Sequence, residues 1–580
     1  MFKIKLYNKF MLSLIVALLV SSCGDMFDLD INDDPNNPAK ASSELLLAQA
    51  EYSLMNLLAA GTSSGSATTN TNNTILGAMG ILATSDDWEL PQNSYDQFWR
   101  EMYAGPLKDL DGLIQDNSTA TGSFQYLGIA QLLKAFAIST MVDLFGDVPY
   151  SQALQGDAES PNMAPGFDDD ASVYAEAFKL IDEGIANVTN PRKAFDVRGD
   201  IIYGGNEVRW RKFGKTLKLR LYLNTRLVDA KAKENIQALI TEGDLILTDA
   251  DDFTFQYSKT FNATFDPRHP WYRTSYTGSN NFTYISHQFM TEMLLDKDPR
   301  FPFYFRRQTK RILNQEDPTD RNTTPCSQLT NCVYNYLVLN PSIHQQLYGT
   351  TTLSAAQKDF LAGIFGRDRA DPSGAPLDGG FRTMPGVYPA GGFYDVTAPA
   401  ASSTGNANRA PGGGIFPVIT SVNTLYYQIE AILTLGVSGD ARALFEKAMR
   451  DHIRKVVDFS VRTDAANAQR PPLMRGDGVT LDVDSYVNLW LKRYDDAPGN
   501  PAKLNVVLKQ LWFSSWGNGY DIYNAFRRTG FPTTLQTPLT PVRGFPLRQP
   551  YPQEELTLNP SAASYKDIAY DRDPVFWDVN

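Results

Sequence analysis

Apolar residues recur at three- to four-residue intervals through much of this chain, and that spacing favours a fold built mainly from amphipathic helices. Segment 124–144 is the most apolar of them and ends at Gly146 and Pro149, while Lys134 and Asp143 within it exclude a membrane span. The same spacing predicts helices at 42–58, 168–188, 207–229, 283–295, 422–435, 440–456 and 501–526. Because these segments follow one another in pairs, we expect stacked helical hairpins similar to tetratricopeptide arrays.

Two long stretches lack helical spacing. Residues 252–281 are rich in aromatic and turn residues, and residues 368–417 contain several Gly-Gly clusters. Long segments of this kind inside a compact protein are usually functional. We therefore expect a mainly α fold of residues 42–580 with a loop-rich insert region in which a ligand binds.

The N-terminus indicates export and lipid attachment. Lys3, Lys5 and Lys9 precede an apolar run that ends in Val20-Ser21-Ser22-Cys23-Gly24, which is typical of a bacterial lipoprotein signal. Residues 1–22 would be removed and Cys23 would carry the lipid, with residues 23–41 as an extended tether. A plain secretory signal with an incidental cysteine is the alternative. The acidic residues that follow Cys23 resemble the surface-export signal of Bacteroidota lipoproteins.

Charge and cysteine content narrow the partners. The formal net charge is −12 before the three lysines of the signal are removed, so we expect no nucleic-acid binding and no binding to an anionic membrane by charge. Besides Cys23 the chain has only Cys326 and Cys332, which bracket a short polar loop. In an oxidising compartment this spacing favours a local disulfide, and the lack of a neighbouring histidine argues against a metal site.

No catalytic set is evident in the sequence. Gly61-Thr62-Ser63-Ser64-Gly65 matches a hydrolase pattern, but a helix precedes it where a strand is needed. The four histidines are scattered without metal-binding spacing. Seven basic residues in 207–229 suggest a salt-bridged or solvated helix face rather than a phosphate site. We therefore expect no catalytic residue, metal or cofactor. A pair of glycosidase carboxylates is left open, because such a pair is recognised by the distance between its carboxyl groups in the folded protein.

The C-terminal part carries a family resemblance. Residues 504–512 lead into Gly519-Tyr520-Asp521-Ile522-Tyr523-Asn524-Ala525-Phe526-Arg527-Arg528-Thr529-Gly530-Phe531-Pro532, which resembles the C-terminal signature of the SusD/RagB family. Further segments with family-like sequence are Asp33–Pro38, Asp143–Tyr150, Asp298-Pro299-Arg300, Arg543–Pro546 and Tyr551–Glu555. Asp521 and Tyr523 depart from the Glu and Trp that the family often has there. The ligand-contacting positions of family members vary, so none is carried over to this chain.

The resemblance implies a helical, tetratricopeptide-like surface lipoprotein of the outer membrane. Such a protein captures nutrients for a SusC-like TonB-dependent transporter and has no enzymatic activity. An oligosaccharide is the expected ligand. The alternatives are a RagB-like peptide-binding lipoprotein, a secreted hydrolase with the same fold, and a structural adhesin.

Aromatic residues outside the helical stripes are the candidate ligand contacts. Trp210 and Trp512 lie on apolar helix faces, where core packing explains them. The candidates are the loop residues Trp88, Trp271, Tyr272, Tyr388 and Tyr394. We expect these rings to be exposed or half-exposed and to converge on one concave surface, because stacked aromatic rings bind sugars through their C–H faces.

Overall fold

The computed structural model describes residues 41–59, 79–81, 87–156, 161–192, 196–261, 266–277, 283–307, 337, 340–364, 366–370, 383–395, 412–462 and 473–579. Within these residues the fold is mainly helical, as predicted. The helices of the first half are α2 (Ser43–Ala59), α4 (Asp96–Met102), α5 (Lys108–Asn117), α6 (Phe124–Phe145), α7 (Asp170–Val188), α8 (Glu207–Asn224) and α9 (Ala232–Glu242). Those of the second half are α10 (Pro270–Tyr272), α11 (His287–Leu295), α12 (Phe301–Tyr304), α14 (Pro341–Tyr348), α15 (Ala355–Ala362), α16 (Ser421–Leu435), α17 (Ala441–Arg462), α18 (Val483–Asp496), α19 (Gly499–Ser514), α20 (Tyr520–Thr529) and α21 (Gln553–Leu558).

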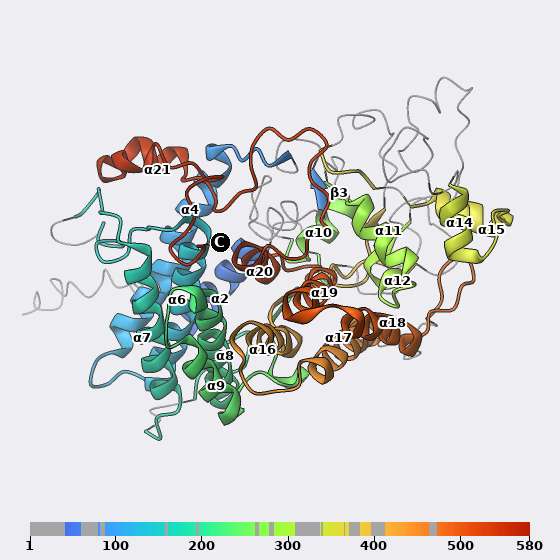
Figure 1. The fold of residues 1–580 in the computed structure, drawn as a ribbon. Coiled ribbons are helices and arrows are strands. Elements are labelled where there is room, and N and C mark those ends of the chain that lie inside the picture. Colours follow the sequence, from blue (N-terminus) through green and yellow to red (C-terminus); the bar gives the residue numbers. More distant parts are fainter. Residues whose placement is uncertain are drawn as a thin grey trace, which may run out of the picture.

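Helices that are near one another in sequence pack in pairs. The pairs are α2 with α5, α6 with α7, α8 with α9, α16 with α17, and α18 with α19. Figure 1 shows the first three pairs on one side of the molecule and the last two on the other, and α8 contacts α16 where the two groups meet. This arrangement agrees with the predicted stack of tetratricopeptide-like hairpins.

Helix α6 forms the centre of the first group. It is long and apolar enough to cross a membrane, but 94% of its apolar window is buried inside the protein, which identifies it as a core helix. Helix α7 packs closely along it because Gly128 and Gly184 lie at the contact: a Cβ on Gly128 would lie 2.7 Å from the Gly184 carbonyl oxygen. Asp169 caps α7 by accepting a hydrogen bond from the backbone nitrogen of Ser172 (3.0 Å).

Four predicted helices have different bounds. The segment predicted at 440–456 continues to Arg462 in α17. The segment predicted at 207–229 ends its α-helix at Asn224. The segment predicted at 283–295 begins as strand β3 (Thr283–Ile285), and its helix starts only after Ser286, whose side chain caps α11. The segment predicted at 501–526 is two helices, since the chain turns between α19 and α20 at Gly517, where φ is +101°.

Short antiparallel sheets join segments that are distant in sequence. They are β1 (Met79–Ile81) with β3, β2 (Phe253–Gln256) with β6 (Ile415–Ile419), and β4 (Phe305–Arg306) with β5 (Met384–Pro385). The β2–β6 pair ties the described parts of the two predicted loop-rich stretches together. These stretches therefore form one region between the two groups of helices.

Candidate functional site

Four of the five predicted ligand contacts lie in that region and are buried. Trp271 packs against Trp516 with ring centroids 4.7 Å apart, and Tyr388 stacks on Tyr304 at 5.7 Å. The other two buried rings are Tyr272 and Tyr394. The expectation that these rings are exposed is wrong, because another aromatic ring packs against each of them, from a distant segment in every case except Tyr272. Their contact with a ligand stays a prediction.

The two segments that carry these rings are bonded to each other. The Tyr276 hydroxyl donates to the carbonyl of Pro385 (2.8 Å), and the backbone nitrogen of His269 donates to the carbonyl of Gly412 (2.7 Å). His269 accepts a hydrogen bond from the backbone nitrogen of Trp271, and burial with the charge of Arg273 lowers the pKa of His269 to about 3. The imidazole is therefore neutral and fixes the start of α10.

Trp88 is the one predicted contact that is half-exposed. Its backbone has φ of +68°, a conformation that is strained for a bulky side chain. The Tyr570 hydroxyl donates to the carbonyl of Trp88 (3.1 Å) and accepts from the backbone nitrogen of Leu90 (3.1 Å), which holds this conformation. The guanidinium of Arg369 lies 4.9 Å from the Trp88 ring centre, and Phe545 meets the ring edge-on at 5.6 Å.

An exposed aromatic side chain that the sequence reasoning missed lies near Tyr272. Phe261 is 59% exposed, and the guanidinium of Arg268 lies 4.9 Å from its ring and 5.3 Å from the ring of Tyr272. Asp266 fixes Arg268 through two hydrogen bonds (2.8 and 2.6 Å). Phe261 follows strand β2 in a polar stretch of the sequence, and this polar surrounding could have indicated that its ring is exposed.

The polar residues of the family-like segments form buried networks. Asp143, at the end of α6, accepts hydrogen bonds from the Tyr174 hydroxyl, the Asn524 amide and the Trp577 indole, each at 2.9 Å. Burial raises the pKa of Asp143 from its ordinary value, although two nearby arginines oppose the shift. The network joins α6, α7, α20 and the C-terminal segment.

Arg528 of the same signature forms a second buried pair. Its guanidinium donates to both carboxylate oxygens of Glu430 on α16 (2.7 and 2.8 Å) and to the Asn224 side chain on α8 (2.8 Å). Burial raises the pKa of Glu430, but the charges of Arg528 and Arg226 outweigh it and hold the pKa below the ordinary value. These residues therefore connect the two groups of helices.

The Asp298-Pro299-Arg300 segment is equally internal. Arg300 is fully buried and bonds Asp298, His452, Tyr486, Gln510 and Ser514. The Arg-Gly-Asp tripeptide at 475–477 is also internal, with a buried ion pair of 2.6 Å between its own two charged side chains. This burial excludes an adhesion role for the tripeptide in the folded protein.

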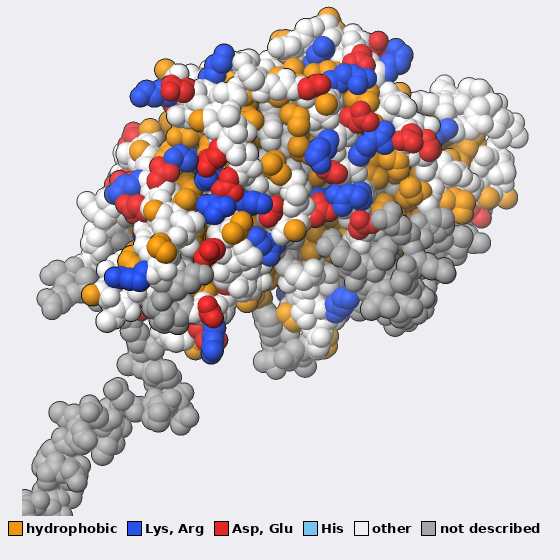
Figure 2. Space-filling model, turned by 90° about the horizontal axis from the view of Figure 1, so that it is seen from below, with side chains coloured by type: hydrophobic (Ala, Val, Ile, Leu, Met, Phe, Trp, Pro, Cys, Tyr) orange, Lys and Arg blue, Asp and Glu red, His pale blue; other side chains and the backbone are white. Residues whose placement is uncertain are grey.

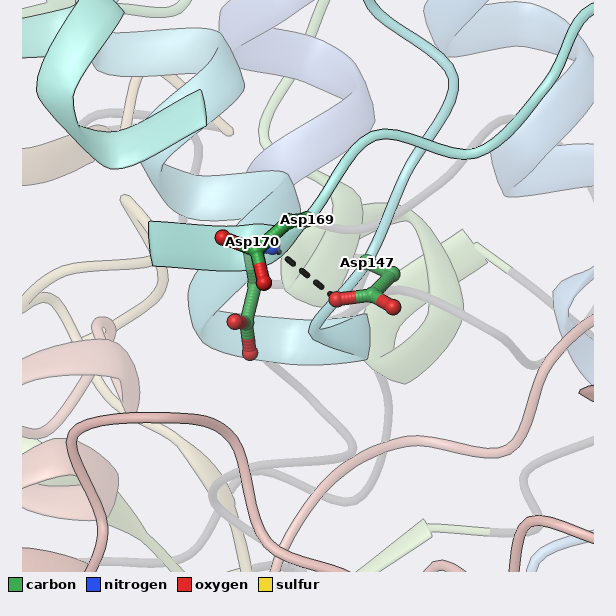
Figure 3. A group of neighbouring side chains, drawn as sticks. All are labelled: Asp147, Asp169 and Asp170. Carbon is green, nitrogen blue, oxygen red and sulfur yellow. Dashed lines mark hydrogen bonds between the residues drawn. The ribbon is translucent and has the colours of Figure 1, made fainter. Parts of the chain in front are cut away.

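Three carboxylates gather where the Asp143–Tyr150 segment meets the start of α7 (Figure 3). Asp147 accepts from the backbone nitrogen of Asp170 and from the Tyr565 hydroxyl (both 2.9 Å). Asp170 accepts from the backbone nitrogen of Phe576 (2.9 Å), and Asp169 caps α7. The three side chains thus secure the helix start and the C-terminal segment, and we assign no metal to them.

The basic face of α8 is salt-bridged, as predicted. Arg211 pairs with Asp244 (2.6 Å) and Lys218 with Asp182 (2.5 Å). The hydrogen bond from Arg211, together with Lys215, lowers the pKa of Asp244 to about 2. Figure 2 shows basic and acidic side chains beside one another across the underside of the molecule. This mixture of charges gives no support to a phosphate or nucleic-acid site there.

A pocket that the sequence reasoning missed lies between α4 and α21. Its volume is about 650 Å³. It is lined by Asp96, Trp99, Arg100, Tyr103, Ala104, Lys108, Pro149, Ala153, Leu154, Gly156, Met163, Pro165, Pro552, Glu554, Glu555 and Leu558. The pocket brings together family-like segments that are far apart in the chain, and the sequence carries no periodic signal for such a meeting.

The predicted lipidation site and disulfide lie outside the described residues. These are Cys23 and the pair Cys326 and Cys332, together with the predicted signal at 1–22 and the tether up to residue 40. All four histidines are described, and each is buried. Burial and the charge of Arg300 lower the pKa of His452 well below its ordinary value.

Comparison with known proteins relates this fold to outer-membrane binding proteins. A SusD-like family model, described as "Starch-binding associating with outer membrane", matches residues 35–361. Similar solved structures include an outer-membrane protein of Bacteroides vulgatus described in terms of nutrient binding (17% identity, TM-score 0.63, covering 93% of this chain and 100% of that one). A SusD/RagB family protein of Bacteroides thetaiotaomicron is 17% identical with a TM-score of 0.63, and the match covers 93% of this chain and 100% of that one. A chitin-binding SusD homologue of Flavobacterium johnsoniae is 17% identical with a TM-score of 0.62, and the match covers 93% of this chain and 99% of that one. No curated protein sequence matches the chain.

Proposed function

The chain belongs to the SusD-like family, described as starch-binding and associating with the outer membrane, and from this premise we propose that it captures oligosaccharides at the cell surface. The protein is anchored by lipid on Cys23 and delivers its ligand to a SusC-like TonB-dependent transporter. It binds its ligand without converting it. The chitin-binding relative of similar fold supports a glycan as the ligand.

Trp88 is the observation that carries this proposal. A half-exposed indole on a strained backbone is costly to maintain for packing alone, and such strain concentrates at functional sites. An indole ring can stack on sugar C–H groups through its apolar face. The carbonyl of Trp88 accepts a hydrogen bond from the Tyr570 hydroxyl, and the carboxylate of Asp87 accepts one from the backbone nitrogen of Glu89. Phe261, which is 59% exposed, provides a further aromatic ring beside the loop-rich region.

The absence of turnover is supported by the state of the polar groups described above. The histidines are buried, and two of them have strongly lowered pKa values, so they are poorly suited to exchange protons with a bound substrate. The carboxylates Asp143, Glu430 and Asp298 are buried and engaged in internal hydrogen bonds. Two of the similar structures reported above are likewise described by binding, one of nutrients and one of chitin.

Calorimetry with maltohexaose and chitohexaose tests the binding site. Replacing Trp88 with Ala should weaken binding by about 5- to 150-fold if one stacking contact of about 1–3 kcal/mol is lost. Phe178→Ala is the matched control, because this partly buried ring of α7 stacks on the ring of Tyr222 of α8, with centroids 4.6 Å apart. Unchanged affinity of a folded Trp88→Ala variant would refute the site. Binding of peptides instead of glycans would favour the RagB-like alternative, and release of shorter sugars would refute a binding-only protein.

Radioactive fatty-acid labelling tests the anchor. The Cys23→Ala variant should lose the label and leave the outer-membrane fraction, because the thiol is the attachment point. A labelled Cys23→Ala variant that still fractionates with the outer membrane would show that the anchor lies elsewhere.

A further inference from the structure

The pocket between α4 and α21 has an apolar interior and an apolar rim. Trp99 and Tyr103 form part of its wall, beside the prolines of the segments that face α4. Met163 and Leu558 stand at its edge and are 78% and 75% exposed, more than any other large hydrophobic side chain that the structure describes. Exposed apolar side chains around an apolar hollow mark a surface that another molecule covers.

The polar groups that line the pocket are already bonded within the chain. The Tyr103 hydroxyl donates to the carbonyl of Pro149 (2.7 Å), and the Lys108 ammonium donates to the carbonyl of Leu154 (3.3 Å). Glu555 accepts from the Asn559 amide (2.7 Å). A glycan needs partners for many hydroxyls, and it would have to break these bonds to obtain them. An occupant with apolar side chains fits the pocket without that cost.

The charges at the pocket mouth favour a basic occupant. Asp96, Glu554 and Glu555 outnumber Arg100 and Lys108, and Arg100 is already paired with Glu554. This excess of carboxylates disfavours anionic lipid headgroups. It also disfavours the acidic segment that follows Cys23 in this chain. A segment with Lys or Arg beside its apolar residues would complement the mouth.

We propose that the α4–α21 pocket is a docking site for an apolar, basic segment of the transporter barrel. The inference rests on the proposed function only for the identity of the partner. An apolar hollow with both apolar and charged side chains at its edge resembles a protein interface hot spot, in which a few large side chains enter the centre and the surrounding residues exclude water. The volume of about 650 Å³ accommodates several such side chains.

Site-specific photo-crosslinking in intact cells tests the proposal. A photoreactive amino acid replaces Leu558 at the pocket rim or, as the control, Val228, which is 46% exposed and does not line the pocket. We expect the position-558 probe to crosslink to a TonB-dependent barrel, on a peptide with an apolar residue beside Lys or Arg, at least tenfold more than the position-228 probe. The Met163→Asn, Leu558→Asn double variant should retain less than a tenth of the co-purified barrel while its glycan affinity stays within twofold of the parent.

The outcomes separate this proposal from the proposed function. If a barrel co-purifies but crosslinks at position 228 rather than 558, or if the double variant retains the barrel, the pocket is not the docking site and the transporter partnership stands. If the crosslinked peptide is acidic, the charge argument is refuted. If glycan binds and no barrel co-purifies with the parent protein, both the docking site and the transporter partnership are refuted.

Discussion

Replacing Arg300 with Met should destabilise the protein strongly, because this side chain holds four elements together. Its guanidinium is fully buried and donates to Asp298 in a bidentate pair (2.9 and 2.6 Å). It also reaches Tyr486 on α18 (2.8 Å) and the side chain of Gln510 on α19 (3.1 Å), and it contacts His452 on α17 (3.0 Å).

The size of the effect follows from what remains after the substitution. Asp298 keeps the hydrogen bond from the Tyr486 hydroxyl (2.6 Å) but loses its counter-charge in a fully buried position. Leaving one member of a buried ion pair unpaired costs about 3–5 kcal/mol. The entropy of unfolding is about 2 cal/mol/K per residue, so in a chain of this length each kcal/mol of lost stability lowers the unfolding temperature by about 1 °C. We therefore expect a decrease of about 3–5 °C.

Calorimetric unfolding measures this decrease, with Arg442→Met as the matched control. Arg442 makes the same bidentate contact with Asp495 (2.7 and 2.8 Å), but both side chains are about half exposed, so the expected cost is about 0–1 kcal/mol. Adding Asp298→Asn to Arg300→Met should recover part of the loss, since it removes the unpaired charge. An Arg300→Met variant that unfolds within 1 °C of the Arg442→Met variant would refute the reasoning.

Further predictions concern packing, proton uptake and the disulfide. Gly128→Ala should lower the free energy of unfolding by about 1–3 kcal/mol, because its Cβ would lie 2.6 Å from a backbone nitrogen of α7. Gly112→Ala, in open space on α5, should leave that free energy unchanged or raise it by up to about 1 kcal/mol. Urea unfolding compares the two variants. Burial and a neighbouring aspartate raise the pKa of Glu51 in the folded protein. The stability that the protonated side chain contributes is fully present below the pKa of the unfolded chain and is lost as the pH rises through the folded pKa. Glu51→Gln should therefore raise the unfolding temperature more at about pH 8 than at about pH 4. Thiol titration of the denatured, unreduced protein should find Cys326 and Cys332 blocked, and two free thiols would refute the bridge.

Periodicity predicted the helices whose ends are marked by local chemistry. The segment predicted at 124–144 is observed at 124–145, because the glycine that follows it adopts φ of +80° and stops the helix. The segment predicted at 168–188 is observed as α7 from Asp170 to Val188, and Asp169 caps it. In such cases the residues that set the boundary lie within one turn of it, so the sequence contains the cause.

Boundaries that depend on distant residues could not be predicted in this way. The turn between α19 and α20 is packed against another segment: a Cβ on Gly517 would lie 2.5 Å from the side chain of Pro389. Strand β3 forms because it pairs with β1, which precedes it by some two hundred residues. Neither neighbour is visible in the local pattern of apolar residues.

The candidate site shows the same limit. Trp271 lacks helical spacing and was therefore taken as exposed, but Trp516 covers it from a turn near the C-terminus. Residue type alone does not separate a ring that meets a ligand from a ring that meets another ring. Trp88 differs from the buried rings through its positive φ and half-exposure, and both are properties of the folded chain.

The segments that identify the family act inside the scaffold, which explains why they reveal the fold and not the ligand. Asp521 stands where the family often has the longer Glu, and here its carboxylate accepts from the Asn423 amide (2.7 Å) and the Tyr427 hydroxyl (2.5 Å) of α16. Asp521, Asn524 and Arg528 are buried, and their side chains are engaged in hydrogen bonds to other helices of the scaffold. Substitutions in this signature should therefore change stability before they change binding. We expect discrimination between ligands to come instead from residues outside these networks, such as Trp88, which is partly exposed, and Phe261, which is 59% exposed.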